Sequence, residues 1–212
     1  MLARKLYLIL ITAKSGNMSN KPKIPLSVAA SYAARFMNKI TPYVDKMELA
    51  GSVRRSCKHV SDIQIVSVNK SIGGLDTLFS DGGFPGMVMN GERLKRFKYP
   101  QNKLQIELYI TSPEDYGRIL CFRTGSSAFV HHVITVRYNR MGWCGTRDGL
   151  RRKKECNHKS KRWEIKPEYA DNPTKPPVFD TEYDFFDFLG LKWTAPQNRN
   201  MKSREEAYNY ST

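Results

Sequence analysis

Three side chains on two short apolar segments are suited to holding a divalent metal ion. Asp62 and Gln64 lie two positions apart in Asp-Ile-Gln-Ile-Val-Ser-Val, and Glu107 lies in Leu-Gln-Ile-Glu-Leu. Residues two apart on a strand point to the same face of a sheet. Mg²⁺ takes oxygen ligands and is held by one or two carboxylates together with substrate phosphates. If the two segments are neighbouring strands, Glu107 is placed to complete a metal site.

A glycine-serine pair precedes the first of these segments. Ala50-Gly51-Ser52 follows a short apolar stretch, and two arginines, Arg54 and Arg55, come directly after it. A turn of this kind leaves backbone N–H groups free to bind phosphate oxygens beside a small hydroxyl. Guanidinium groups match phosphate geometry with paired donors. Spacing alone therefore indicates a site for phosphate and metal, and indicates nothing more specific.

The elements that must position these residues are predicted from apolar periodicity. Leu26, Ala29, Ala33 and Phe36 recur at helical spacing and end before Thr41-Pro42. The expected strands cover residues 47–50, 63–68, 93–99 and 104–110, and the expected helices cover residues 25–40, 112–122, 127–141 and 181–189. Residues 71–91 are glycine-rich and are expected to form a loop with a short helix or strand. This order of elements indicates an α+β protein.

Composition favours a polyanionic partner. The chain has 212 residues, with 35 lysines and arginines against 20 acids, so its formal net charge is +15. Such an excess favours nucleic acid as partner, although a charge excess without any such partner stays open as the alternative. With 40% hydrophobic residues the chain can form a core, which excludes wholesale disorder. No apolar run is long enough for a membrane helix, and four cysteines without a CxxC pair suggest a reduced, cytoplasmic protein.

In combination, these motifs resemble those of DNA polymerase beta and the X family of DNA polymerases, in the short bacterial and phage form. Gly51-Ser52-Val53-Arg54-Arg55 resembles the Gly-Ser-x-Arg-Arg motif of that nucleotidyltransferase family, and residues 61–66 resemble its Gly-Asp-x-Asp/Glu strand. Glu107 stands where the family has its third carboxylate. Thr124-Gly125-Ser126 resembles the turn beside the incoming sugar, and residues 185–193 resemble the closing helix and its Trp-containing tail. The resemblance covers residues 24–199.

The resemblance implies a nucleotidyltransferase palm with a mixed β-sheet and flanking helices, plus a small C-terminal thumb-like subdomain. The expected division is a flexible N-terminal extension over residues 1–23, the palm over 24–110, a helical and basic thumb-like subdomain over 111–199 and a polar tail over 200–212. We expect no room for the N-terminal lyase domain of larger relatives, so the grip on duplex DNA would come from the basic C-terminal half.

The implied activity is that of a DNA-directed DNA polymerase, which adds deoxynucleotides to a primer 3′-hydroxyl in gap filling or repair, with Mg²⁺ or Mn²⁺. Asp62 would bridge two metal ions with help from Gln64, and Glu107 would bind the catalytic metal and take the proton of the 3′-hydroxyl.

The expected nucleotide-binding residues are Gly51, Ser52, Arg55, Ser61, Phe122 and Gly125. The expected DNA-binding residues, in a basic run over 151–162, are Arg151, Arg152, Lys153 and Lys154. We expect a monomer in the cytoplasm of a bacterium or an infected host cell, acting on primer-template or gapped DNA and deoxynucleoside triphosphates.

Three departures from the family pattern keep alternatives open. Gln64 stands where the family has an acid, and a neutral amide is a weaker ligand for a divalent ion. Glu107 replaces the commoner Asp, and Arg123 rather than an aromatic residue precedes Thr124, which leaves sugar choice open. The alternatives are a transferase that adds nucleotides without a template, or a catalytically impaired nucleic-acid-binding relative.

Overall fold

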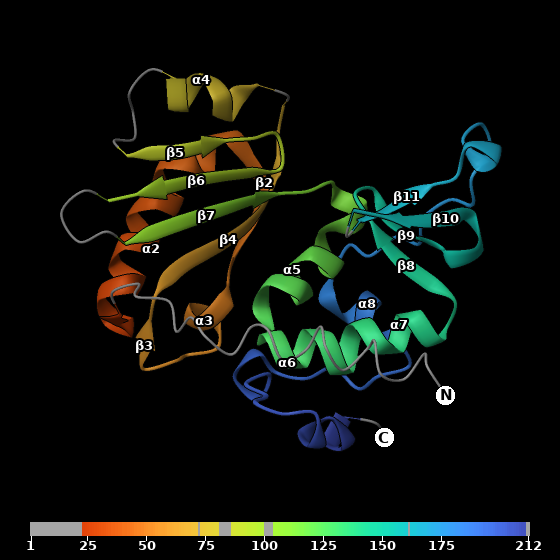
Figure 1. Cartoon of the computed structure of the whole chain (residues 1–212). Helices are drawn as coiled ribbons and strands as arrows, with labels where there is room; N and C mark the ends of the chain where they lie inside the picture. Colours follow the sequence, from red (N-terminus) through yellow and green to blue (C-terminus); the bar gives the residue numbers. More distant parts are fainter. Residues whose placement is uncertain (1–22, 72, 81–85, 100–103, 161, 211–212) are drawn as a thin grey trace.

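The fold is that of a computed structural model (Figure 1), and it is described for residues 23–71, 73–80, 86–99, 104–160 and 162–210. All but one residue of the expected N-terminal extension, 1–23, lie outside the described residues.

A mixed five-stranded sheet forms the first half of the chain. Its strands, in spatial order, are β2 (Val44–Ala50), β4 (Asp62–Asn69), β7 (Gln105–Ile110), β6 (Leu94–Lys98) and β5 (Met87–Asn90). The β4 and β7 strands run parallel, and every other neighbouring pair is antiparallel. The predicted α+β class is therefore confirmed, and all four predicted strands are present with bounds shifted by a few residues.

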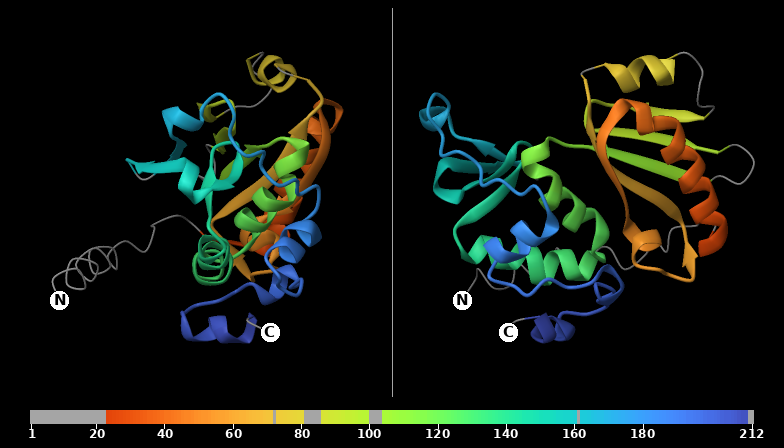
Figure 2. Two further views of the ribbon diagram at one scale, coloured as in Figure 1. Left: turned by 90° about the vertical axis from the view of Figure 1, so that its right-hand side faces the viewer. Right: turned by 180° about the vertical axis from the view of Figure 1, so that it is seen from behind.

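Helices cover both faces of this sheet. On one face, α2 (Leu26–Ile40) lies across the strands (Figure 2, right). Phe36 of α2 and Leu75 of α4 (Gly74–Ser80) pack in one core with Ile63, Ile65 and neighbouring apolar side chains. On the other face, α5 (Tyr116–Thr124) packs through Tyr116 and Leu120 onto Val66 and Val68. Because side chains alternate along a strand, Asp62 and Gln64 of β4 lie on the α5 face, as predicted.

A second apolar core holds the C-terminal half together. The segment α6 (Ser127–Phe129), η4 (Val130–Thr135) and α7 (Val136–Arg140) forms one helical run whose middle is a π-helix. It packs against α8 (Glu182–Phe188), which Thr181 caps with its hydroxyl, as its sequence predicts. Both runs are followed by glycines with positive φ, Gly142 at 79° and Gly190 at 61°, which is the expected way for a helix to end.

Shorter elements complete the chain. The short elements around the sheet include the strands β1 (Ile24–Pro25) and β3 (His59–Val60) and the helix α3 (Gly51–Arg54). The 3₁₀ turns are η2 (Thr41–Tyr43), η3 (Pro113–Asp115), η5 (Lys153–Glu155), η6 (Pro167–Tyr169), η7 (Pro196–Asn198) and η8 (Glu205–Tyr210). No helix in the described part of the chain combines the length and the apolar character that crossing a membrane requires.

The basic run over residues 151–162 lies mostly in short strands where the structure describes it. It belongs to two antiparallel hairpins, β8 (Trp143–Thr146) with β9 (Gly149–Arg152) and β10 (Cys156–Lys159) with β11 (Arg162–Ile165). Each strand has only four residues, and the run over 151–162 contains few apolar residues. The alternation of apolar and polar residues that predicts a strand is therefore missing from this run. The expected polar tail also packs onto the protein, because Met201 is buried and the Tyr210 ring contacts Phe129.

Candidate functional site

A cavity of about 250 Å³ lies where residues 51–64 meet the distant segment 122–127. It is lined by Gly51, Ser52, Arg55, Asp62, Gln64, Phe122, Arg123, Gly125, Ser126 and Ser127. These residues come from the turn into α3, the start of β4 and the turn between α5 and α6. Every predicted nucleotide-binding residue except Ser61 lines this cavity, together with Asp62 and Gln64.

The turn into α3 requires a glycine. Gly51 has φ +61°, in the left-handed region that side chains disfavour, and a Cβ there would lie 2.9 Å from Oε1 of Gln64. The backbone of the glycine-serine turn therefore packs directly on the Gln64 side chain. This contact brings the turn to the polar end of β4.

Parallel pairing places the predicted acids on one face of neighbouring strands. Gln64 of β4 lies opposite Glu107 of β7, and Asp62 lies opposite Gln105. Asp62 and Glu107 therefore point to the same side of the sheet, toward α5. An arrangement on opposite faces would have excluded a shared site.

Glu107 is 6% exposed, and hydrogen bonds occupy both of its carboxylate oxygens. Oε1 accepts from Gln105 Nε2 at 2.7 Å and from Arg96 Nε at 3.0 Å, and Arg96 Nη2 lies 2.9 Å away. Oε2 accepts from the Tyr109 hydroxyl at 2.5 Å and from Gln64 Nε2 at 3.3 Å. Three neutral donors and one guanidinium thus hold the carboxylate in place.

Tyr109 remains a proton donor to Glu107. Burial raises the pKa of the Tyr109 hydroxyl most strongly, and the hydrogen bond to Glu107 and the charges of Glu107 and Asp62 raise it further. The Arg123 guanidinium, 3.8 Å from the centre of the Tyr109 ring, opposes this shift. The net effect keeps the hydroxyl protonated at ordinary pH.

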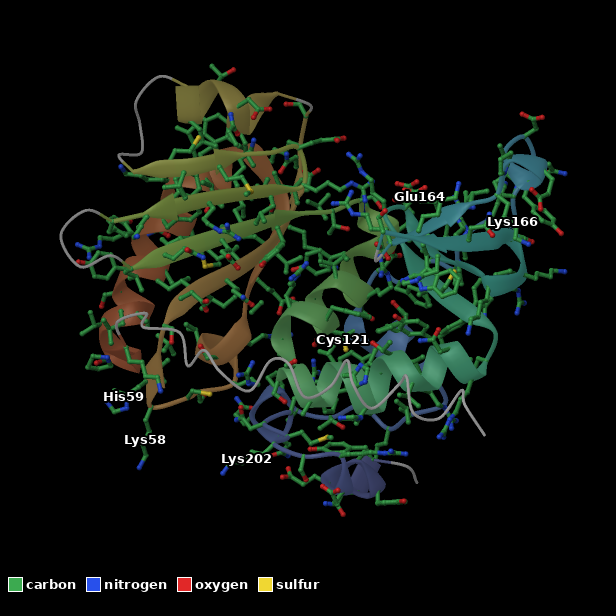
Figure 3. The ribbon with its side chains drawn as sticks, viewed as in Figure 1. Lys58, His59, Cys121, Glu164, Lys166 and Lys202 are labelled. Carbon is green, nitrogen blue, oxygen red and sulfur yellow. The ribbon has the colours of Figure 1, made fainter. Side chains whose placement is uncertain are left out.

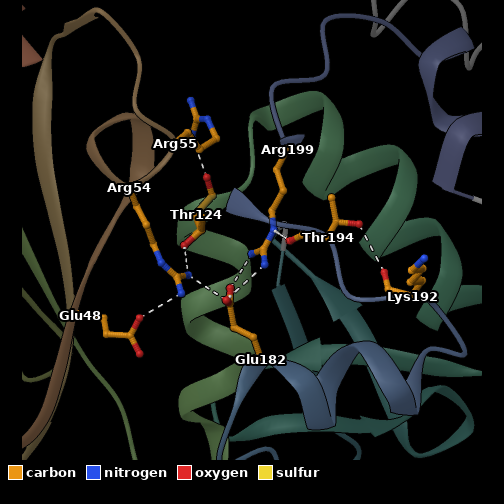
Figure 4. Close-up of polar contacts among 8 residues, drawn as sticks. All are labelled: Glu48, Arg54, Arg55, Thr124, Glu182, Lys192, Thr194 and Arg199. Atoms are coloured by element: carbon orange, nitrogen blue, oxygen red, sulfur yellow. Dashed lines mark hydrogen bonds and ion pairs between the residues drawn. The ribbon is translucent and has the colours of Figure 1, made fainter. Parts of the chain in front are cut away.

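The two arginines of the Gly-Ser-x-Arg-Arg motif have different surroundings (Figure 4). Arg55, which lines the cavity, donates to the Thr124 carbonyl at 2.7 Å and to Asn200 at 2.6 Å. Arg54 donates to the Thr124 hydroxyl and lies 3.0 Å from Glu48 and 2.9 Å from Glu182. Arg54 therefore joins the sheet to the C-terminal half, whereas Arg55 is the one of the two that lines the cavity.

The predicted DNA-binding residues lie in the hairpin region, and none of them lines the cavity. Arg151 donates to the Thr174 carbonyl at 2.7 Å, and Arg152 lies over the Trp143 ring at 4.0 Å. Lys153 is 5.6 Å from the centre of the Trp163 ring, and Lys154 is exposed. Ser61, directly before β4, also lies outside the set that lines the cavity.

Three partners of Glu107 were missed in the sequence. Gln105 and Tyr109 each lie two positions from Glu107 on a predicted strand, so the period-2 rule already places them on its face. Arg96 lies in another predicted strand, and only the pairing of β6 with β7, Arg96 opposite Glu107, brings it to the carboxylate. The order of the strands in the sheet is needed to place Arg96 beside Glu107.

The donor set suits one divalent cation rather than two. Asp62 offers a carboxylate and Gln64 an amide oxygen, and Mg²⁺ is commonly held by one carboxylate together with substrate phosphates. Glu107 already accepts hydrogen bonds on both oxygens. In the portions of the chain that the structure describes, no group of three or more histidine, cysteine, aspartate or glutamate side chains is placed to hold a metal ion. A pair of ions held by three carboxylates therefore does not fit these residues.

Neither protein-family models nor curated protein sequences give a match to this chain.

Proposed function

We propose that the chain is a DNA polymerase of the X-family type, built on a nucleotidyltransferase palm, that adds deoxynucleotides to a primer 3′-hydroxyl at a low rate. One observation carries the proposal: the glycine-serine turn, Arg55 and Asp62 line a single cavity together with the Gly125 turn, which is distant from them in sequence. Glu107, on the neighbouring strand, faces the same side of the sheet.

Each side chain has a role in this proposal. The backbone at Gly51 and the Ser52 hydroxyl would bind triphosphate oxygens, and Arg55 would balance their charge. Asp62 and the Gln64 amide oxygen would hold Mg²⁺, which when bound neutralises phosphate charge. The 3′-hydroxyl attacks the α-phosphate in line and expels pyrophosphate, and an oxygen of Glu107 takes the hydroxyl proton.

The low rate follows from the surroundings of Glu107. Its lone pairs already accept from Arg96, Gln105, Tyr109 and Gln64, so these donors compete with the primer hydroxyl for the same oxygens. Gln64 also contributes no charge to cation binding.

The hydrogen bonds that Glu107 accepts also favour a second candidate function. A carboxylate that is already neutralised by a guanidinium suits a protein that kept nucleic-acid binding and lost metal-dependent chemistry. Such a protein would bind DNA through its +15 charge, with an affinity that falls steeply as salt rises.

Primer extension with Mg²⁺ or Mn²⁺, with and without a template strand, separates these functions. We expect extension by the wild type with template, loss of extension in Asp62→Ala, and retention in Asp45→Ala, a matched control on an exposed carboxylate of β2. Equal extension without template would indicate a template-independent transferase. No extension, with salt-sensitive DNA binding retained, would replace the polymerase proposal with the second candidate.

A further inference from the structure

Three cavities, each sharing lining residues with the next, lie in a row from the candidate site to the β10–β11 hairpin. The site cavity shares Phe122 and Arg123 with a second cavity of about 280 Å³. The second cavity shares Arg93, Thr146 and Arg147 with a third of about 620 Å³. We call the second and third cavities together the arginine groove, because Arg93, Arg118, Arg123, Arg147 and Arg162 line it.

The groove ends at an aromatic ring surrounded by cationic and aromatic side chains. Trp163 of β11 lines the third cavity beside Arg162. Its ring centre lies 5.0 Å from that of His158 on the paired strand and 5.6 Å from Lys153 Nζ. A partly exposed tryptophan next to positive charge is a stacking platform for a nucleobase, since every base has an aromatic face.

Two turns approach each other across the groove. Arg93, after β5, pairs with Asp148 at 2.9 Å, and Arg147 pairs with Glu92. Both pairs are largely exposed, with 46% and 58% of the first pair's side chains accessible. Exposed ion pairs are weak in water, so phosphates can replace Asp148 and Glu92 at these arginines. Arg118 differs, because it is buried and bound at both oxygens of Asp115.

We propose that the arginine groove binds a single strand of nucleic acid, with a base stacked on Trp163 and phosphates at Arg93, Arg147 and Arg162. The cavity volumes are of the size that small ligands occupy, so they accommodate nucleotides and not a double helix. Stacking on Trp163 also requires an unpaired base. That this strand leads to a polymerase site rests on the proposed function. That a single strand binds in the arginine groove does not depend on the proposed function.

Fluorescence anisotropy of a labelled oligothymidylate, in EDTA and without nucleotide, tests this proposal. We expect Trp163→Ala to weaken binding roughly tenfold, because a base loses its stacking partner, and Trp163→Phe to retain most of the affinity. Arg162→Ala should weaken binding and reduce the slope of log K against log salt by about one. Lys58→Ala is the matched control, since Lys58 is an exposed cation on the opposite side of the molecule from Glu164, the neighbour of Trp163 (Figure 3).

Variants that remove a negative charge from the groove should have the opposite effect on binding. Glu92→Gln and Asp148→Asn remove carboxylates that compete with phosphate and should tighten binding, whereas Asp187→Asn, an exposed acid on α8, should tighten it less. Thermal unfolding verifies that each variant is folded.

The proposal is overturned if folded Trp163→Ala and Arg162→Ala bind the oligothymidylate as the wild type does, or if the wild type does not bind it. Equal binding of a blunt duplex with the same loss in Trp163→Ala would also overturn it, because the ring would not require an unpaired base. Primer extension by wild type and Asp62→Ala reports on the proposed function separately, so either proposal can fail while the other stands.

Discussion

Glu107 and Glu182 are both buried glutamates with arginine partners, yet they belong to different kinds of cluster. Glu182 lies between two guanidinium groups, with Arg199 at 2.5 and 3.2 Å and Arg54 at 2.9 Å, and Arg199 is completely buried. Glu107 pairs with the guanidinium of Arg96, whose side chain is 30% exposed, and it also accepts from the neutral donors Gln64, Gln105 and Tyr109.

Under the proposed function, this difference separates a structural carboxylate, Glu182, from a proton-accepting one, Glu107. The Glu182 cluster joins α3, α8 and the C-terminal segment, and Arg199 also donates to the Thr194 carbonyl (Figure 4). Its charges are withdrawn from water and bound to each other. The Glu107 cluster lies on the sheet face beside Gln64, which lines the candidate cavity and donates to the Glu107 carboxylate.

Breaking the Glu182 cluster should have the largest effect on stability. Arg199→Met leaves Glu182 buried with Arg54 as its one remaining guanidinium partner, and removing one member of a buried ion pair costs about 3–5 kcal/mol. The free energy of unfolding, from urea titration monitored by circular dichroism, measures this loss.

A double variant serves as the control for that prediction. Glu182→Leu with Arg199→Met removes both charges and should be more stable than Arg199→Met alone, because no carboxylate is left short of a partner. If Arg199→Met unfolds like the wild type, the Glu182 cluster does not hold the two halves together.

The corresponding change at the other cluster should cost less stability and more activity. Glu107→Gln replaces one accepting oxygen with an NH2 group that faces donors, but Arg96 can turn toward water, so we expect a loss of about 1–3 kcal/mol. Primer extension should fall to background, because an amide does not accept the hydroxyl proton. Full activity in Glu107→Gln, or a stability loss as large as that of Arg199→Met, would remove the distinction between the clusters.

Local pattern predicted the parts of the site that depend on one strand or one turn. Asp62 and Gln64 share a face because strands alternate, Thr181 begins a helix because its hydroxyl caps the N-terminus, and Gly51 occupies a turn that tolerates no Cβ. Each of these is decided by neighbours in sequence.

Contacts between distant segments could not be predicted in the same way. The motif does not distinguish the surroundings of Arg54 from those of Arg55. Only the folded chain brings Glu182 to Arg54 and leaves Arg55 lining the cavity. Arg96 reaches Glu107 because β6 pairs with β7, and neither strand carries a signal for that order. The hairpins over residues 143–165 were missed because their strands are short and polar.

Placing an acid at position 64 tests whether the donors around Glu107 stand in for a cation. Gln64→Glu puts a carboxylate directly opposite Glu107 in place of the amide that donates to it, and like charges on paired strands cost roughly 0.2–1 kcal/mol. We expect a lower melting temperature in EDTA, a rise on adding Mg²⁺ that exceeds the rise of the wild type, and higher primer-extension activity. A metal-independent melting temperature together with reduced activity would contradict this account of position 64.

Glu155 extends the comparison to a carboxylate that hydrogen-bonds a hydroxyl and a backbone N–H, and here the smallest effect is expected. It accepts from the Thr174 hydroxyl at 2.6 Å and the Thr174 backbone N–H at 3.1 Å. The hydrogen bond from the hydroxyl is the main cause that holds the pKa of Glu155 below its usual 4.5.

A carboxyl whose pKa is lower in the folded than in the unfolded chain stabilises the fold at pH values above its unfolded pKa. This contribution is lost as the pH falls through the folded pKa. Glu155→Gln should therefore melt slightly below the wild type at neutral pH, and the two curves should converge below about pH 4.5. A gap that stays constant with pH would mean that the charge of Glu155 does not hold the Thr174 segment against the hairpins, in contrast to the charged clusters at Glu107 and Glu182.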